Sequence, residues 1–286
     1  MDFCINFIIN DYSEDKTYEI LKQFSLKDKR IKIINNTKNY GLLYSRAMGI
    51  IHSSGEYLIN LDPDDEFKDP DVLKYLYYKI KNANVDFISF TFLEKSSMHL
   101  INECGEANKI IRQPKLFELM YNKSPDLLVW NKLIKREIFL KAYKLFENYI
   151  YYKKWNYHED DIWALLVHKV ATSKLCENRL IYIYNNNLNK KSLMRNKECL
   201  IQYTNIIYRF EMRRKILNDT IHFNYLSKQC DLLIGGINNS VNFQKFIRTS
   251  SELRNITFHN LKICSNNYKI VKNNKNIAIN LFKTFY

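Results

Sequence analysis

The chain has 286 residues and a mass of 34.4 kDa, enough to bury a full core as one large domain or as a domain with an appendage. Hydrophobic residues make up 46% and aromatic residues 14% of the sequence, which excludes a disordered chain. No apolar run is long enough to cross a bilayer, no signal peptide opens the sequence, and the six cysteines lack metal or redox spacing. We therefore expect a cytoplasmic protein with reduced cysteines.

The net charge of +14 is concentrated in the C-terminal part of the sequence. Residues 190–286 contain 17 Lys and Arg against 5 Asp and Glu, a balance of +12. A basic region of this kind can bind nucleic acid, an anionic membrane surface or an anionic substrate, and the sign of the charge does not choose among them. Because no recognisable nucleic-acid-binding motif accompanies the charge, nucleic acid is the least favoured of these partners.

The first predicted unit is a strand, a polar loop and a helix. Residues 4–9 have the composition of a buried strand, residues 10–17 are polar and turn-forming, and residues 18–24 have helical periodicity. A second strand over residues 31–34 and a helix from about residue 42 to 51 follow. In open α/β sheets the loops at the carboxyl ends of such strands bind ligands.

An acidic cluster follows the next predicted strand. Residues 57–61 form a short apolar run that ends in Asp62, Asp64 and Asp65. Carboxylates at the end of a buried strand repel one another unless a cation lies among them. Their oxygen atoms suit Mg²⁺ or Mn²⁺, usually shared with a substrate phosphate. The alternative is an acidic turn before a helix with Asp69 as its N-cap, which leaves the three other carboxylates unexplained.

The remaining elements continue the alternation of strands and helices. We expect a helix over 70–82, a strand over 85–92, a helix near 115–121, a helix after residue 133 and a strand over 180–184. A second acidic cluster, Glu159 to Asp161, precedes apolar residues at helical spacing and so lies at a helix N-terminus. The pattern predicts an α/β fold over residues 1–189, a mostly parallel sheet with helices on both faces, and a basic helical region over 190–286.

The order of these motifs resembles the family-2 glycosyltransferases with the GT-A fold. The resemblance covers roughly the first 190 residues, and its most specific part runs from Asn39 to Asp65. It rests on Asn10-Asp11-Tyr12-Ser13-Glu14-Asp15, Asn39-Tyr40-Gly41, Ser45-Arg46, Gly49, Gly55-Glu56-Tyr57, Leu61-Asp62-Pro63-Asp64-Asp65, Trp130-Asn131-Lys132-Leu133 and Glu159-Asp160.

The resemblance implies an inverting, metal-dependent transferase that uses a nucleotide-sugar donor. Asn10 and Asp11 would recognise the base, Arg46 would lie near the nucleotide, and Asp62 would approach the ribose. Asp64 and Asp65 would hold Mn²⁺ or Mg²⁺ on the donor diphosphate, which neutralises charge on the leaving group. Among the acids of the second cluster, Glu159, Asp160 and Asp161, one would deprotonate the acceptor hydroxyl. The donor would be UDP-linked and the acceptor a glycan or a lipid-linked molecule.

Structural explanations compete with several of these roles. The second acidic cluster can simply complement a helix dipole. Arg46 on an amphipathic helix is more often a solvated charge than a ligand, and Trp130 is expected in the core.

The sequence departs from the family in two respects. It starts at what resembles the second strand of the family, so we expect a gap in the sheet and fewer nucleotide contacts. Tyr12 replaces a glycine of the first loop. An inactive sugar-nucleotide-binding relative is therefore an alternative to an active transferase.

The basic C-terminal region suggests attachment to the inner, anionic face of a membrane. This requires Lys190, Lys191, Arg195, Arg213, Arg214 and Lys215 to share a face with exposed aromatic residues. The alternative is a solvated helical appendage whose lysines serve solubility.

Overall fold

The computed structural model describes residues 4–102, 105–119, 127–150 and 159–185. All of them belong to the first of the chain's two units, Met1–Arg195. The predicted domain boundary at 189/190 and the basic residues proposed for membrane attachment lie outside the described residues. Within the described ranges, no helix is both long and apolar enough to span a membrane.

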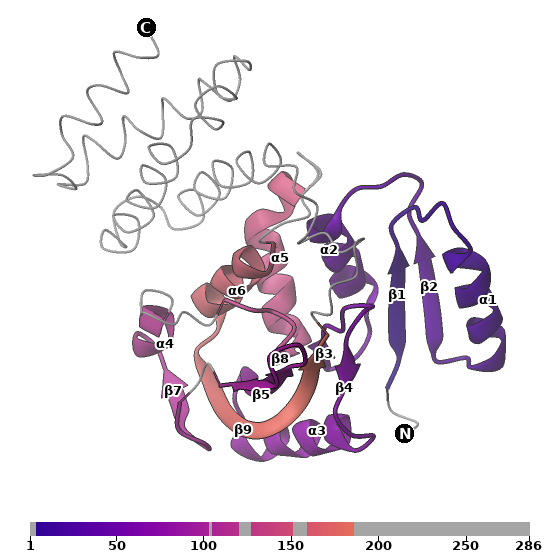
Figure 1. The fold of residues 1–286 in the computed structure, drawn as a ribbon. Helices are drawn as coiled ribbons and strands as arrows, with labels where there is room; N and C mark the ends of the chain where they lie inside the picture. Colours follow the sequence, from indigo (N-terminus) through magenta and orange to yellow (C-terminus); the bar gives the residue numbers. More distant parts are fainter. Residues whose placement is uncertain (1–3, 103–104, 120–126, 151–158, 186–286) are drawn as a thin grey trace, which may run out of the picture. The chain divides into compact units, whose positions relative to one another are not determined.

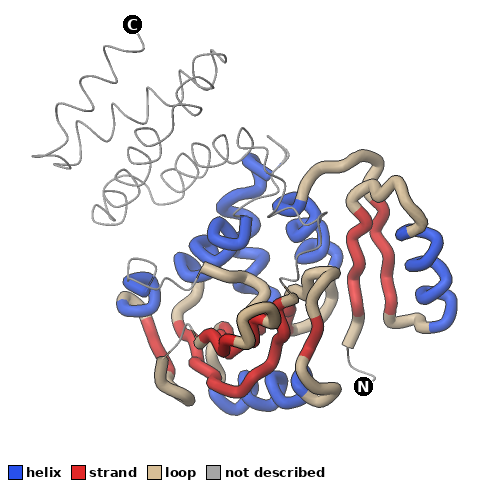
Figure 2. Tube along the Cα trace, in the orientation of Figure 1, coloured by secondary structure: helices blue, strands red, loops and turns tan. Residues whose placement is uncertain are grey.

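The N-terminal strands form a small sheet of their own. β1 (Asn6–Asn10) and β2 (Ile31–Asn35) pair in parallel and are connected by helix α1 (Thr17–Lys27). The loops that follow the two strands leave the same edge of this sheet, as parallel pairing requires (Figure 2). Helix α2 (Leu42–His52) comes next and packs against β1. These four elements confirm the predicted order.

A larger sheet contains the remaining described strands (Figure 1). Its order is β3-β8-β5-β9-β4, with β6 paired to β5 and β7 paired to β9. Helix α3 lies on one side of this sheet, and α5 and α6 lie on the other. The strands are β3 (Tyr57–Ile59), β4 (Glu66–Phe67), β5 (Phe87–Glu94), β6 (His99–Ile101), β7 (Ile110–Arg112), β8 (Lys132–Lys135) and β9 (Ser173–Tyr184), and the helices are α3 (Val72–Ala83), α4 (Lys115–Glu118), α5 (Arg136–Ile150) and α6 (Glu159–Val170).

The α/β fold with helices on both faces is confirmed, but the strand pairing needs a correction. Among the described strands, only β1–β2 and β5–β9 pair in parallel, and every other pairing is antiparallel. The expectation of a mostly parallel sheet assumed that each connection is a helical crossover. Short connections such as the one between β5 and β6 instead produce antiparallel neighbours. In the described part of the chain no pairing joins β1 to β3, which agrees with the expected gap in the sheet.

Three predicted boundaries also move. Strand β3 begins at Tyr57 and ends at Ile59, two residues earlier than predicted. Its residues are only half-buried and Leu61 is 48% exposed, so the acidic cluster does not follow a fully buried strand. Helix α3 begins at Val72 rather than Pro70, and its N-cap is Asp71. Helix α4 begins at Lys115 and ends at Glu118. Strands β4, β6 and β7 have two or three residues each, too few for a periodic pattern in the sequence.

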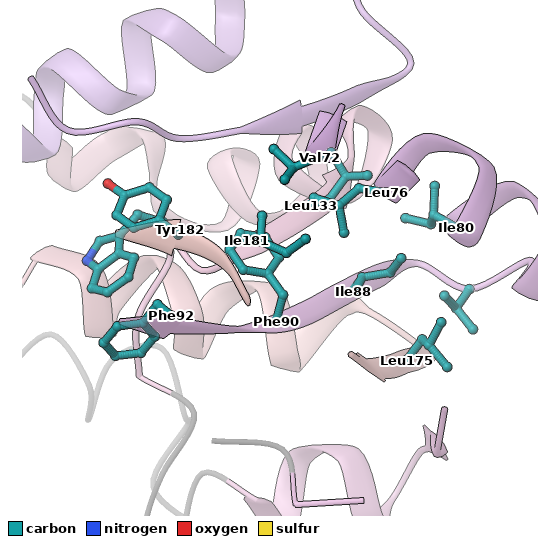
Figure 3. Close-up of a cluster of buried hydrophobic side chains, with 12 residues drawn as sticks. Val72, Leu76, Ile80, Ile88, Phe90, Phe92, Leu133, Leu175, Ile181 and Tyr182 are labelled. Carbon is teal, nitrogen blue, oxygen red and sulfur yellow. The ribbon is translucent and has the colours of Figure 1, made fainter. Parts of the chain in front are cut away.

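The core lies between β5, β9 and α3 (Figure 3). Six consecutive residues of β5, Phe87 to Phe92, are buried because this strand is covered on both faces. Val72, Leu76 and Ile80 of α3 pack onto it at helical spacing. Each large apolar side chain buried here stabilises the fold by about 1.5–3 kcal/mol. This core fixes the end of β9, where Tyr182 reaches the acidic residues that follow β3.

Candidate functional site

Asp11, at the end of β1, organises the loop that follows β2. Its carboxylate accepts hydrogen bonds from the Tyr40 amide (2.9 Å), the Gly41 amide (2.7 Å) and the Asn36 side chain (2.7 Å). Gly41 has a φ of 92°, a left-handed conformation that glycine adopts without a steric penalty. The Asn39-Tyr40-Gly41 motif therefore serves to turn two backbone amides toward Asp11 at the start of α2.

Asn10 is buried and also hydrogen-bonded within this region. Its side-chain amide donates to Asn35 Oδ1 at 2.5 Å, and its Oδ1 accepts from the Ser13 amide at 3.2 Å. Tyr12 follows with a φ of 62°, so it occupies a left-handed conformation that suits the glycine expected there. Asn10 and Asp11 thus lie at one edge of the small sheet, and their contacts in the described residues are with the protein. Base recognition by these two residues stays a prediction.

The acidic cluster after β3 is a tight turn. The Asp65 amide donates to the Asp62 carbonyl at 3.1 Å, which closes a four-residue β-turn. Asp in the first position and Pro63 in the second are the residues that such turns favour, since proline presets the φ angle there. The sequence Asp62-Pro63-Asp64-Asp65 therefore specifies its own local geometry, and we call it the acidic turn.

The three carboxylates of the acidic turn have different surroundings. Asp64 is exposed and takes no hydrogen bond from the part of the chain that the structure describes. Asp62 pairs with Arg46. Asp65 accepts from the Tyr182 hydroxyl at 2.6 Å and from the Asn185 amide at 2.7 Å, and burial raises its pKa to about 6. The turn therefore places one carboxylate in solvent and fixes the other two through protein contacts.

Arg46 connects the acidic turn to the second acidic cluster. Its Nη2 lies 2.8 Å from Asp62 Oδ1, 3.3 Å from Glu159 Oε1 and 3.4 Å from Asp160 Oδ1. Arg46 belongs to α2, Asp62 follows β3, and the two other acids open α6. The structure thus brings together residues predicted for two different roles, the nucleotide and the acceptor. The reading of Arg46 as a solvated charge is wrong, because its side chain is 6% exposed.

Burial governs the electrostatics of this network. Burial raises the pKa values of both Glu159 and Asp160, and repulsion from neighbouring carboxylates adds to the shift. Arg46 opposes the shift in both residues. Lys132 of β8 also favours the ionised form of Asp160, so the Trp130-Asn131-Lys132-Leu133 segment contributes a charge to the site. Trp130 itself is in the core, as expected.

Access distinguishes the three acids at the start of α6. The Asp160 side chain is 23% exposed, whereas that of Glu159 is 4% exposed. Asp161 is buried. A general base must reach a substrate hydroxyl directly or through one water molecule, so Asp160 is best placed among the three. A raised pKa also makes its carboxylate a stronger base than an ordinary aspartate.

The acids of this site do not form a complete protein cage for a metal ion within the described residues. The described residues contain no group of three His, Cys, Asp or Glu side chains arranged to hold a metal ion. Magnesium in such sites is often bound by one or two carboxylates together with substrate phosphates and water, so a complete protein cage is not required. The exposed carboxylate of Asp64, two residues after Asp62 in the acidic turn, fits such a site. The predicted metal role of Asp65 stays a prediction.

One residue of the site has no local signal in the sequence. Tyr182 of β9 donates to Asp65 and accepts from the Asp62 amide at 3.2 Å, and it lies 117 positions after Asp65. The segment was predicted correctly as a strand, but a strand pattern does not reveal which tyrosine reaches the acidic turn.

The segment that carries Asp11, Arg46 and the acidic turn matches a known family of proteins. Residues 6–142 match the model of glycosyl transferase family 2. This segment belongs to that family. The matched range includes Asp11, Arg46 and the acidic turn, and it ends before the acids of α6.

Sequence relatives of the family 2 domain include two bacterial proteins described as uncharacterized glycosyltransferases. EpsJ of Bacillus subtilis is 26% identical over 187 residues, which cover 64% of this chain and 52% of EpsJ. A protein of Haemophilus influenzae is 26% identical over 250 residues, which cover 77% of this chain and 76% of that protein. The glycosyltransferase GlyA of Streptococcus pneumoniae is 32% identical, with 46% of this chain and 20% of GlyA covered. The chain thus spans about half the length of EpsJ and less of GlyA.

Solved structures of TarS from S. aureus share the GT-A fold with this chain. The structure of TarS residues 1–349 in complex with UDP has a TM-score of 0.59 and 14% identity, covering 99% of this chain and 79% of that one. The complex of TarS with UDP-GlcNAc has a TM-score of 0.58 and 15% identity, covering 91% of this chain and 71% of that one. Because these proteins are only 14–15% identical to this chain, the similarity establishes a shared fold and nothing further.

Proposed function

We propose that this family 2 domain transfers a sugar from a nucleotide-diphosphate donor, UDP-linked in our proposal, to an acceptor hydroxyl. The observation that carries the proposal is the Arg46 network, in which one buried guanidinium holds Asp62 of the acidic turn and Asp160 of α6. Donor and acceptor must meet at one carbon atom, so the residues that serve each of them must lie close together. The UDP and UDP-GlcNAc complexes of TarS support a donor of this class.

In the proposed reaction the acceptor oxygen attacks the anomeric carbon from the face opposite the leaving diphosphate. The attack inverts the configuration at that carbon. Asp160 takes the proton of the acceptor hydroxyl as the new bond forms. Arg46 keeps this carboxylate ionised although it is partly buried, because the guanidinium compensates its charge.

The proposed cation is Mn²⁺ or Mg²⁺. Asp64, with Asp62 beside it, would hold the cation, which neutralises charge on the departing diphosphate when bound. The protein's own part is to present an exposed carboxylate at the corner of a rigid turn. The acceptor is proposed to be a glycan or a lipid-linked molecule, and the basic region after residue 190 is proposed to attach to the inner face of an anionic membrane.

An inactive sugar-nucleotide-binding protein is the second candidate. It is favoured by Asp11, whose carboxylate already accepts three protein hydrogen bonds, and by Tyr12, which occupies a position suited to glycine. Both features reduce the number of contacts that this loop can make with a nucleotide. An inactive relative would keep the Arg46 network for stability and bind the donor without turnover.

The test measures donor turnover and donor binding in the same preparations. The full chain is incubated with UDP-sugars and Mn²⁺, release of UDP is followed, and UDP binding is measured by calorimetry. We expect UDP release by the wild type, a loss of at least 100-fold in Asp160→Asn, and unchanged UDP binding by that variant. Glu147→Gln, which removes the ion pair of this partly exposed residue with Lys144 on α5, is the matched control. Binding without turnover in the wild type would support the inactive alternative, and equal turnover by Asp160→Asn would remove this residue from the reaction.

A further inference from the structure

The end of β9 holds the acidic turn through one tyrosine hydroxyl. Tyr182 accepts a hydrogen bond from the Asp62 amide at 3.2 Å and donates one to Asp65 Oδ2 at 2.6 Å. The Asn185 amide, three residues further along, donates to Asp65 Oδ1 at 2.7 Å. Both ends of the acidic turn are therefore attached to β9, and each oxygen of the Asp65 carboxylate has a protein donor.

The ring of Tyr182 is rigidly held. The residue is fully buried, its ring stacks on Trp130 with 4.7 Å between ring centroids, and Phe67 packs edge-on at 6.0 Å. Figure 3 shows its hydroxyl oxygen directed away from the apolar residues of the core. Because packing fixes the ring, the hydroxyl group has a fixed position. Its two hydrogen bonds therefore fix the position of the acidic turn.

Asp64 differs from Asp65 in its exposure and in its hydrogen bonds. It occupies the corner of the turn, is exposed, and takes no hydrogen bond from the described residues. A carboxylate that binds a cation must offer its lone pairs to it, and no donor among the described residues occupies those of Asp64. Asp65 is half-buried, and its carboxylate is hydrogen-bonded to Tyr182 of β9. These contacts stabilise the turn and direct the Asp65 carboxylate away from solvent.

We propose that Tyr182 is a positioning residue of the acidic turn, which acts through Asp65 to present Asp64 and Asp62 to a divalent cation and a nucleoside diphosphate, and that Asp65 is not a ligand of the cation. This inference rests on the proposed function, because it concerns the same site. It assigns a role to a residue outside the acidic motif, and it separates two adjacent aspartates that the sequence does not distinguish.

The experiment compares Mn²⁺-dependent UDP binding by calorimetry in five forms of the full chain. They are the wild type, Tyr182→Phe, Asp65→Asn, the double variant, and Tyr184→Phe as the matched control. Tyr184 lies two residues further along β9 and also stacks on Trp130. We expect Tyr182→Phe and Asp65→Asn each to weaken binding about 5- to 15-fold, the effect of losing about one hydrogen bond. The double variant should weaken binding less than the product of the two single effects, since both changes alter the shared contact between Tyr182 and Asp65. Tyr184→Phe should bind as the wild type does.

Two further measurements keep the result decisive. Hydrogen exchange should show a faster Asp62 amide in Tyr182→Phe and an unchanged one in Tyr184→Phe. If Tyr182→Phe does not fold, Asn185→Pro removes the other donor to Asp65 while leaving the core intact, and we expect the same weakening of UDP binding.

Three outcomes would overturn the inference. Loss of all Mn²⁺ dependence in Asp65→Asn, with wild-type binding by Tyr182→Phe, would show that Asp65 is a ligand of the cation. Additive effects in the double variant would show that the two residues act separately. Wild-type binding by Tyr182→Phe and Asn185→Pro would show that the turn does not need β9. Absence of Mn²⁺-dependent UDP binding by the wild type would instead overturn the proposed function itself.

Discussion

Arg46 and Glu159 are 113 positions apart in the sequence, yet Arg46 Nη2 lies 3.3 Å from Glu159 Oε1. Their side chains are 6% and 4% exposed, so the pair is shielded from solvent. A buried charge is stable only when its partner is present, because neither ion can return to water. The pair therefore joins α2 to α6 as well as serving the site.

Removal of the Arg46 charge should destabilise the domain. Arg46→Met keeps the length of the side chain and leaves the carboxylates of Asp62 and Asp160 uncompensated. We expect the free energy of unfolding to fall by about 3–5 kcal/mol. Urea denaturation measures the loss. Lys81→Met, which breaks the exposed pair with Glu56, is the control and should leave the midpoint unchanged. A midpoint for Arg46→Met equal to that of the wild type would contradict the role of the network.

The contribution of Glu159 to stability should decrease as the pH rises from acidic toward neutral values. Burial, and next the charge of Asp160, raise the pKa of Glu159 above its ordinary value. Between the ordinary pKa of a glutamate and the raised pKa of Glu159, the native state retains a proton that the unfolded state has released. The contribution of this group to the free energy of unfolding therefore falls with rising pH. Glu159→Gln cannot titrate at this position, so in urea unfolding over a pH series the free energy of unfolding of the variant should change more favourably with rising pH than that of the wild type. A pH dependence of Glu159→Gln equal to that of the wild type would show that this carboxyl does not carry the effect.

The loop before α2 should depend on Asp11. Asp11→Ala leaves the amides of Tyr40 and Gly41 without their acceptor, which we expect to cost about 1–3 kcal/mol. Hydrogen exchange at Gly41 should accelerate, and the urea midpoint should fall. Glu14→Ala in the same loop is the control. Protection of the Gly41 amide in Asp11→Ala would show that another group holds the loop.

Tyr12→Gly should not destabilise the protein. The left-handed conformation costs a residue with a Cβ atom about 1–2 kcal/mol, and glycine relieves this cost while adding about 0.5–1 kcal/mol of entropy to the unfolded state. The free energy of unfolding should stay equal or rise by up to about 1 kcal/mol. Lys22→Gly, in the exposed middle of α1, should lower it by about 1 kcal/mol. Equal losses in both variants would mean that Tyr12 has contacts that outweigh its conformation.

The two sheets should differ in local stability. Helix α1 has no buried residue, and Tyr18, Ile20, Phe24 and Leu26 are exposed, whereas six of the eight residues of β5 are buried. Regions that bury little apolar surface open at a lower free energy. Native-state hydrogen exchange should therefore show opening of β1, α1 and β2 before β5 and β9. A single opening free energy for both sheets would contradict this expectation.

The sequence alone determined the elements whose signals are local. Long amphipathic helices such as α3 and apolar strands such as β5 follow from periodicity, because burial of one face imposes that spacing. The acidic turn follows from Asp62 and Pro63, whose preferred conformations build it. The candidate residues at the ends of β1 and β3 and at the start of α6 were also recognised from the sequence, and the roles that the family resemblance implies for them stay predictions.

Only the tertiary structure decided which of these residues act together. Pairing directions in the larger sheet depend on short strands that leave no periodic pattern, so the sheet is mostly antiparallel where alternation predicted parallel strands. The contacts of Arg46 with Glu159 and of Tyr182 with Asp65 join residues more than 100 positions apart. Such contacts exist only after the core around β5 and β9 has packed, because packing fixes the directions of side chains that the sequence leaves open.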